Sequence, residues 1–185
     1  MQTFADEITL PETKPETEWI ADRGVQKVSP TFEHGVLQGA FFRVLDDWSK
    51  AGGRGKVATE WRFRVSVPGA VVHPLVPDVA FMSFERLRPL SKDERRYPLI
   101  APEIVVEILS PTDEPKDVET KRKEYLAWGV SLVLLVDPES RSMEACDSAG
   151  NNGTIGAVES YSPLAFPALH LPMRALFAEL DIPGD

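Results

Sequence analysis

A single glutamate interrupts the most apolar stretch of this sequence. Residues 104–109 are branched and apolar except for Glu107. Because the odd and even positions are otherwise both apolar, the stretch is typical of a β-strand buried on both faces. A buried carboxylate costs several kcal/mol unless a cation, a metal or a hydrogen-bond donor faces it. The sequence therefore predicts a positively charged or donating group opposite Glu107.

A lysine on the following helix is a candidate for that group. Residues 115–129 begin with proline and end with glycine, which favours a helix over this range. Val118, Lys121 and Tyr125 recur at helical spacing on one face, so Lys121 is predicted to point toward the sheet. An inward lysine needs an anion, and Glu107 is one. Taken alone, Glu107 and Lys121 could equally form an ion pair with a purely structural role.

A second carboxylate lies in an earlier predicted strand. Asp78 follows Pro77, but the chain continues as an apolar strand through residues 79–82, so the pair does not simply form a turn. Two carboxylates on adjacent strands, with an ammonium group nearby, are typical of a site for a hard cation. Oxygen ligands suit Mg²⁺ or Mn²⁺. Such a site could stabilise the transition state of phosphodiester hydrolysis.

Two further acids are candidates for an additional role in this site. Residues 57–67 alternate as a half-buried strand and 71–82 return as its hairpin partner, which places Glu60 roughly opposite Asp78. Glu33 lies in the first turn of a helix predicted from Ser29-Pro30 to Gly52-Gly53. By itself, this position favours complementation of the helix dipole over a role in the site. The neighbouring His34 could orient a phosphate or a water, although a histidine at a helix start is more typical of the surface.

The remaining elements predict a mixed α/β sheet in one domain. A small hairpin is expected at residues 18–28 with its turn near Gly24, and a second fully apolar strand at 132–136. The helix between the two apolar strands makes them a parallel pair at the sheet centre. A hairpin partner at 142–147, a strand at 155–160 and a closing helix at 171–180 complete the domain, 18–185. Residues 1–17 are predicted to be an acidic N-terminal arm.

Composition restricts the class of protein. The single cysteine excludes an intramolecular disulfide and fits a reducing, cytoplasmic environment. No apolar run is long enough for a membrane span, and the N-terminus lacks the pattern of a signal peptide. The net charge of −9 disfavours binding to nucleic acid. Part of that charge is local, because residues 1–22 contain six acids and one lysine.

Several motifs occur in an order that resembles a known family. They lie at residues 77–81 (PDVAF), 102–111 (PEIVVEILSP), 117–130 (D-x3-K-x3-Y-x3-GV) and 134–138 (LLVDP). As a set they are similar to the Uma-two family, formerly a domain of unknown function, which belongs to the PD-(D/E)XK nuclease superfamily of restriction endonucleases. The resemblance covers roughly residues 18–180.

The resemblance implies a restriction-endonuclease-like αβββαβ core, a divalent metal, DNA as substrate and a homodimer. Asp78 and Glu107 take the places of the two motif acids and would bind the metal. Leu109 stands where the motif has lysine, and Lys121 matches the position from which this family is thought to supply it. The alternative is a catalytically inert relative that binds nucleic acid or a protein partner and keeps Glu107 and Lys121 as a structural pair.

Overall fold

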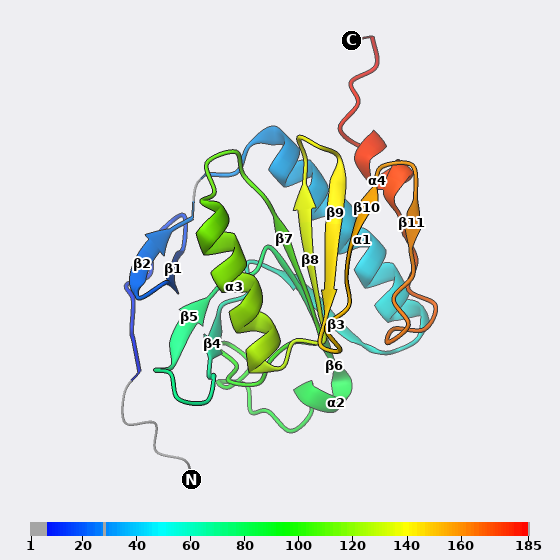
Figure 1. The fold of residues 1–185 in the computed structure, drawn as a ribbon. Helices are drawn as coiled ribbons and strands as arrows, with labels where there is room; N and C mark the ends of the chain where they lie inside the picture. Colours follow the sequence, from blue (N-terminus) through cyan, green and yellow to red (C-terminus); the bar gives the residue numbers. More distant parts are fainter. Residues whose placement is uncertain (1–6, 28, 185) are drawn as a thin grey trace.

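A six-stranded mixed β-sheet forms the centre of the protein (Figure 1). The computed structural model describes residues 7–27 and 29–184. The strands of this sheet, in spatial order, are β10 (Asn152–Gly156), β9 (Ser142–Asp147), β8 (Leu132–Asp137), β7 (Ile104–Ile108), β6 (Val79–Ser83) and β3 (Gly55–Thr59). The helices are α1 (Phe32–Ala51), α2 (Phe84–Leu87), α3 (Pro115–Trp128) and α4 (Met173–Ala178).

The connectivity of the sheet is the predicted αβββαβ core. Strands β3, β6 and β7 pair antiparallel in succession, and α3 carries the chain from β7 to its parallel neighbour β8. Strands β9 and β10 extend the sheet antiparallel beyond β8. The mixed α/β fold class is therefore confirmed, with the two apolar strands paired in parallel at the centre.

Helices cover both faces of this sheet. On one face α1 packs over alternate residues of β7, such as Ile104 and Val106, and α4 packs against α1 in the same core. On the other face Tyr125 of α3 packs against Val105 and its neighbours. Since successive side chains of a strand point to opposite faces, Glu107 shares the α3 face with Val105.

The predicted long hairpin is broken in the middle. Its first strand divides into β3 and β4 (Phe63–Val65), and its second into β5 (His73–Leu75) and β6. Glu60 adopts a left-handed conformation with φ of 50°, which ends the β3 ladder. Pro77, which has no N–H to donate to a ladder, lies on the facing segment. Strands β4 and β5 consequently leave the main sheet and pair with each other.

The small N-terminal hairpin forms with a different turn. Strands β1 (Thr17–Ile20) and β2 (Arg23–Gln26) pair antiparallel, and Ala21 and Asp22 make the turn with φ of 49° and 60°. The expectation of a turn at Gly24 was wrong, because Gly24 pairs within β2. Val28, the last residue of the predicted hairpin, lies outside the described residues.

Other boundaries differ from the predictions by a few residues. Helix α1 begins at Phe32, because Thr31 rather than Ser29 caps it by accepting a hydrogen bond from the His34 N–H. The strand expected at 155–160 is replaced by β10 and the short β11 (Ser160–Tyr161), which pairs with β12 (Leu171–Pro172). The closing helix, α4, is correspondingly shorter than predicted.

Residues 7–16, the described part of the N-terminal arm, run against the β4–β5 pair. The Ile8 N–H donates to the Val72 carbonyl at 2.8 Å, and Glu7 pairs with Arg64. These contacts bring the chain to the start of β1 beside the central sheet. No helix within the described ranges is long and apolar enough to cross a membrane.

Candidate active site

Three acids lie in a row across neighbouring strands. Thr59 pairs with Val79 and Val79 pairs with Val106, so the next positions, Glu60, Asp78 and Glu107, face one another where the ladders end. The Glu60 N–H donates to the Asp78 carbonyl at 3.3 Å. The predicted juxtaposition of Glu60 with Asp78 is thus observed, and Glu107 completes the row.

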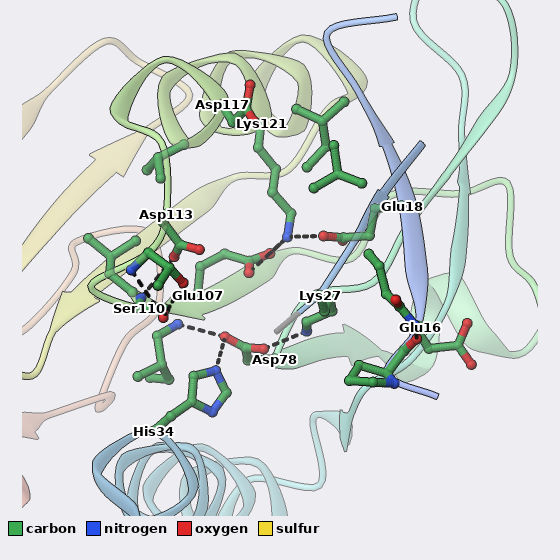
Figure 2. Close-up of a pocket in the computed structure, with 18 of the residues that line it drawn as sticks. Glu16, Glu18, Lys27, His34, Asp78, Glu107, Ser110, Asp113, Asp117 and Lys121 are labelled. Carbon is green, nitrogen blue, oxygen red and sulfur yellow. Dashed lines mark hydrogen bonds and ion pairs between the residues drawn. The ribbon is translucent and has the colours of Figure 1, made fainter. Parts of the chain in front are cut away.

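Asp78 is buried and its carboxylate accepts hydrogen bonds on both oxygens. Lys27 Nζ lies 2.6 Å from Oδ1, while the Ile108 N–H donates to Oδ2 at 2.7 Å. His34 Nε2 is 3.2 Å from Oδ2 (Figure 2). Burial disfavours the charged carboxylate, but the His34 hydrogen bond and the Lys27 charge outweigh it and hold the pKa of Asp78 below its usual value.

Glu107 is buried on the α3 face, as expected, and contacts two side chains of that helix. Lys121 Nζ lies 3.0 Å from its carboxylate, and the Tyr125 hydroxyl donates to Oε1 at 2.6 Å. Burial raises the pKa of Glu107 to about 7, against the opposing charge of Lys121 and with the charges of Asp78 and Glu18 adding to the increase. The site therefore holds one carboxyl group that titrates close to neutral pH.

Lys121 is the buried lysine of α3, which agrees with the helical-face argument. Its neighbour Lys123 keeps 69% of its side chain exposed. Besides Glu107, Lys121 Nζ contacts Glu18 Oε2 at 2.8 Å. Burial disfavours the ammonium charge, but the two carboxylates outweigh it and raise the pKa of Lys121, so this lysine is protonated at neutral pH.

The N-terminal hairpin supplies two site residues that the sequence reasoning missed, Glu18 and Lys27. Glu18 Oε1 accepts the Val76 N–H at 2.6 Å, and its other oxygen binds Lys121. One signal could have identified it: Glu18 lies two residues before Ile20, on the buried face of the same strand. Lys27 follows directly after β2 and carries no comparable signal.

Every hydrogen-bond partner of the Lys27 ammonium among the described residues is an oxygen atom. Besides Asp78, its ammonium contacts the Val76 carbonyl at 3.0 Å and Glu60 Oε2 at 3.1 Å. Burial disfavours this charge, but the surrounding carboxylates outweigh it and raise the pKa of Lys27. This environment of carboxylate and carbonyl oxygens has the donor chemistry of a hard-cation site.

The other predicted candidates divide between the site and the surface. Glu60 lines the cavity, where it contacts Lys27 and accepts a hydrogen bond from Gln38 Nε2 at 2.8 Å. Glu33 is exposed and does not line the cavity. Its place in the first turn of α1 fits complementation of the helix dipole. His34, one residue further, points inward to Asp78.

A cavity of about 660 Å³ contains this cluster. Its walls come from the N-terminal hairpin, the start of α1, the end of β7 and the first turns of α3 (Figure 2). Four carboxylates, from Glu18, Glu60, Asp78 and Glu107, stand against the two ammonium groups of Lys27 and Lys121. The cluster therefore has an excess of negative charge that a divalent cation would neutralise.

The donor set fits a metal bound mainly by two side chains and water. In the described part of the chain, no three His, Cys, Asp or Glu side chains are grouped closely enough to bind a metal ion together. Mg²⁺ typically takes one or two carboxylates and keeps several waters, so a pair such as Asp78 and Glu107 is sufficient for it.

Comparisons with known proteins identify the family of the chain. A sequence model of the Uma2 family, described as a putative restriction endonuclease, matches residues 4–174. No curated protein matches the chain. Among solved structures, the chain is similar to a putative nuclease of DUF820 from Anabaena variabilis, with a TM-score of 0.81 and 25% identity over 93% of this chain and 95% of that one. The chain therefore belongs to the Uma2 family of putative restriction endonucleases.

Proposed function

We propose that this protein is a divalent-metal-dependent nuclease that hydrolyses phosphodiester bonds of DNA, with Asp78, Glu107 and Lys121 as its catalytic residues. The observation that carries the proposal is that Asp78 and Glu107 face each other at the end of the β6–β7 ladder, with the buried Lys121 ammonium against Glu107. Membership of the Uma2 family supports it.

The metal would be held by Asp78 and Glu107, as Mg²⁺ or Mn²⁺. When bound, such an ion stabilises negative charge on a phosphate and lowers the pKa of a water ligand. Lys121, which is protonated, would stabilise the charge of the phosphorane-like transition state rather than remove a proton. His34 and the Ile108 N–H would fix the orientation of the Asp78 carboxylate.

Glu60 is the better candidate for an additional acid. It lies in the same row of acids as Asp78 and lines the cavity, whereas Glu33 does not. In this proposal Glu60 acts through Lys27, whose ammonium it shares with Asp78.

A second candidate function is a catalytically inert relative that binds nucleic acid or a protein partner. One observation favours it: every oxygen of Asp78 and Glu107 already has a partner within the chain, from Lys27, His34, Ile108, Lys121 and Tyr125. A scaffold of this kind would need no metal.

Cleavage of supercoiled plasmid and of single-stranded DNA, in Mg²⁺, Mn²⁺ or EDTA, tests the proposal. We expect metal-dependent nicking by the wild type and a loss of at least about 100-fold in Asp78→Asn, Glu107→Gln and Lys121→Met. Glu33→Gln is the matched control, because this exposed acid lies outside the cavity and its variant should cleave like the wild type.

Two further measurements decide between the candidate functions. The melting temperature of each variant shows whether reduced cleavage reflects a failure to fold. Absence of cleavage by the folded wild type, together with no Mn²⁺ binding, would establish the inert alternative.

We further propose that the protein acts as a homodimer, because a symmetric pair of sites would cut both strands of a duplex in one encounter. Light scattering of the protein eluting from a sizing column measures the assembly. A monomer that still makes double-strand breaks in one binding event would contradict this part of the proposal.

A further inference from the structure

A second hollow, of about 510 Å³, adjoins the edge strand β3. Its walls are β3, the residues that follow it, α2 and the loop after α2. Three cations and two aromatic rings define its chemistry: Lys56, Arg88, Arg95, Trp61 and Phe84. We call this hollow the edge groove.

The three cations of the edge groove are available to a ligand. Lys56, Arg88 and Arg95 are all exposed, and none of them forms an ion pair with any carboxylate that the structure describes. Lys56 Nζ and Arg88 Cζ instead lie 5.9 and 5.7 Å from the centre of the Phe84 ring. Positive charge and a partly exposed aromatic ring therefore occur together on one surface.

The fold holds this arrangement in place. Trp61 Nε1 donates to the Arg95 carbonyl at 3.0 Å, and Arg95 Nε donates to the Leu87 carbonyl at 3.2 Å. The Trp61 ring packs at 4.8 Å from the buried Phe63 ring. These contacts fix the loop after α2 against the strand edge, so the groove is preformed.

The sequence segment that supplies the cations of this groove is net positive. Residues 54–98 contain nine lysines and arginines against five acids, a net charge of +4, although the whole chain carries −9. The rest of the sequence therefore carries a net charge of −13. Arg62, Arg64 and Arg86 of this segment pair with acids outside it. The segment is thus locally basic within an acidic chain, and the cations of the edge groove are among those in it that form no ion pair with a described residue.

The edge groove meets the catalytic cavity at Glu60, which lines both. The carboxylate at this junction is compensated, because Lys27 lies 3.1 Å from it and Gln38 donates to it. A polymer lying in the groove would therefore lead directly to Asp78 without crossing an unpaired acid.

We infer that the edge groove binds a single-stranded segment of the nucleic-acid substrate and directs it into the catalytic cavity. Phosphates would contact Lys56, Arg88 and Arg95, and bases would stack on Trp61 and Phe84. Bases in a duplex already stack on one another, so the two rings select an unpaired strand. The inference rests on the proposed function for the identity of the catalytic cavity.

The test measures binding of a fluorescein-labelled twelve-residue thymidine oligonucleotide to the full chain in EDTA. Fluorescence anisotropy reports the binding, which is measured at several salt concentrations. Lys56→Gln with Arg88→Gln removes two exposed charges of the groove. We expect weaker binding and a slope of log K against log salt that is smaller by about 1.4, or about 0.7 for each phosphate that no longer meets a cation.

Lys92→Gln with Arg96→Gln is the matched control. It removes the same number of positive charges, from the loop after α2, but neither residue lines the groove. It should bind with the wild-type affinity and slope. Equal effects of the two double variants, or unchanged binding by the groove variant, would overturn the inference.

An abasic oligonucleotide and a duplex test the stacking directly on the wild type. The abasic strand has the same backbone charge, so we expect it to bind at least about fivefold more weakly if a base stacks on the rings. Equal binding of the abasic strand, or preference for the duplex, would overturn the choice of a single strand.

The same assay separates the edge groove from the proposed function. It needs neither metal nor cleavage, so a wild type that binds through the groove but never cleaves would refute the nuclease alone. If cleavage depends on Asp78 but the groove variant binds like the wild type, the inference about the edge groove is refuted and the proposed nuclease is not.

Discussion

The Lys27 ammonium lies 2.6 Å from Oδ1 of Asp78, the acid at the centre of the row. Two further oxygen ligands, from Val76 and Glu60, complete its surroundings. A side-chain cation thus occupies a set of oxygen donors that would also attract a metal ion.

Removal of this charge should strengthen metal binding. We expect Lys27→Met to bind Mn²⁺ at least about tenfold more tightly than the wild type, because a cation a few ångströms from a metal repels it by roughly 4 kcal/mol at an effective dielectric constant of about 20. Electron paramagnetic resonance of free Mn²⁺ measures the affinity. Lys14→Met is the control, since Lys14 lines the same cavity but is exposed. Weaker binding in Lys27→Met would show that the lysine assists the metal.

The Tyr125 hydroxyl should contribute measurably to stability. Tyr125→Phe keeps the buried ring but removes the donor to Glu107 Oε1, and hydrogen bonds to charged groups are worth about 1.5–3 kcal/mol. Urea unfolding should show a loss in that range. Tyr161→Phe should change stability little, because the Tyr161 hydroxyl has no hydrogen bond to any residue that the structure describes. Equal effects of the two substitutions would contradict the role of the Glu107 contact.

Glu18 should matter far more to folding than its neighbour Glu16. Glu18→Ala leaves the buried Lys121 ammonium with one carboxylate fewer and the Val76 N–H without its acceptor, which should cost about 3 kcal/mol or more. Glu16 pairs with Arg62 at 3.4 Å near the surface, and Glu16→Ala should cost less than about 1 kcal/mol. Melting temperatures of the two variants measure the difference, and similar values would argue against a buried Glu18–Lys121 pair.

Metal binding should depend on pH through Glu107. Below its pKa of about 7 the carboxyl carries a proton that a metal must displace, so Mn²⁺ affinity should increase up to about tenfold per pH unit below 7 and level off above it. Calorimetry in buffers of different ionisation enthalpy should detect the released proton.

His34 could produce a dependence of the same sign. Burial lowers its pKa, but the hydrogen bond and charge of Asp78 outweigh burial and raise it above 6.5, and a protonated His34 would repel a metal. The His34→Gln variant separates the two groups. A pH dependence that disappears in this variant would assign the effect to His34 and refute the assignment to Glu107.

The part of the site that the sequence could predict is the part encoded by local periodicity. Helical spacing was enough to turn Lys121 inward, and the alternation of two strands was enough to bring Glu60 opposite Asp78. The direction of Lys121 and the pairing of Glu60 with Asp78 both follow from the regular spacing of residues in a helix or a strand close to a recognisable turn or cap.

The rest of the site depends on contacts between distant segments. Nothing near Lys27 in the sequence indicates that the N-terminal hairpin packs against α3, and a glutamate gives no signal of the left-handed conformation that Glu60 adopts. The sequence favoured a surface position for His34, because the helix cap at Thr31 and the position of α1 over the sheet, which direct its ring to Asp78, do not follow from the local pattern.

The contact between Glu18 and Lys121 also has a consequence for the order of folding. The two residues are 103 positions apart in the chain, and Arg23 and Asp117 of the same interface are 94 apart. Contacts of this separation carry a large loop-closure entropy, so we expect the hairpin to dock after the sheet and its helices have formed. The cavity would then be the last part of the molecule to assemble, and amide hydrogens of β1 should become protected later during refolding than those of β7 and β8.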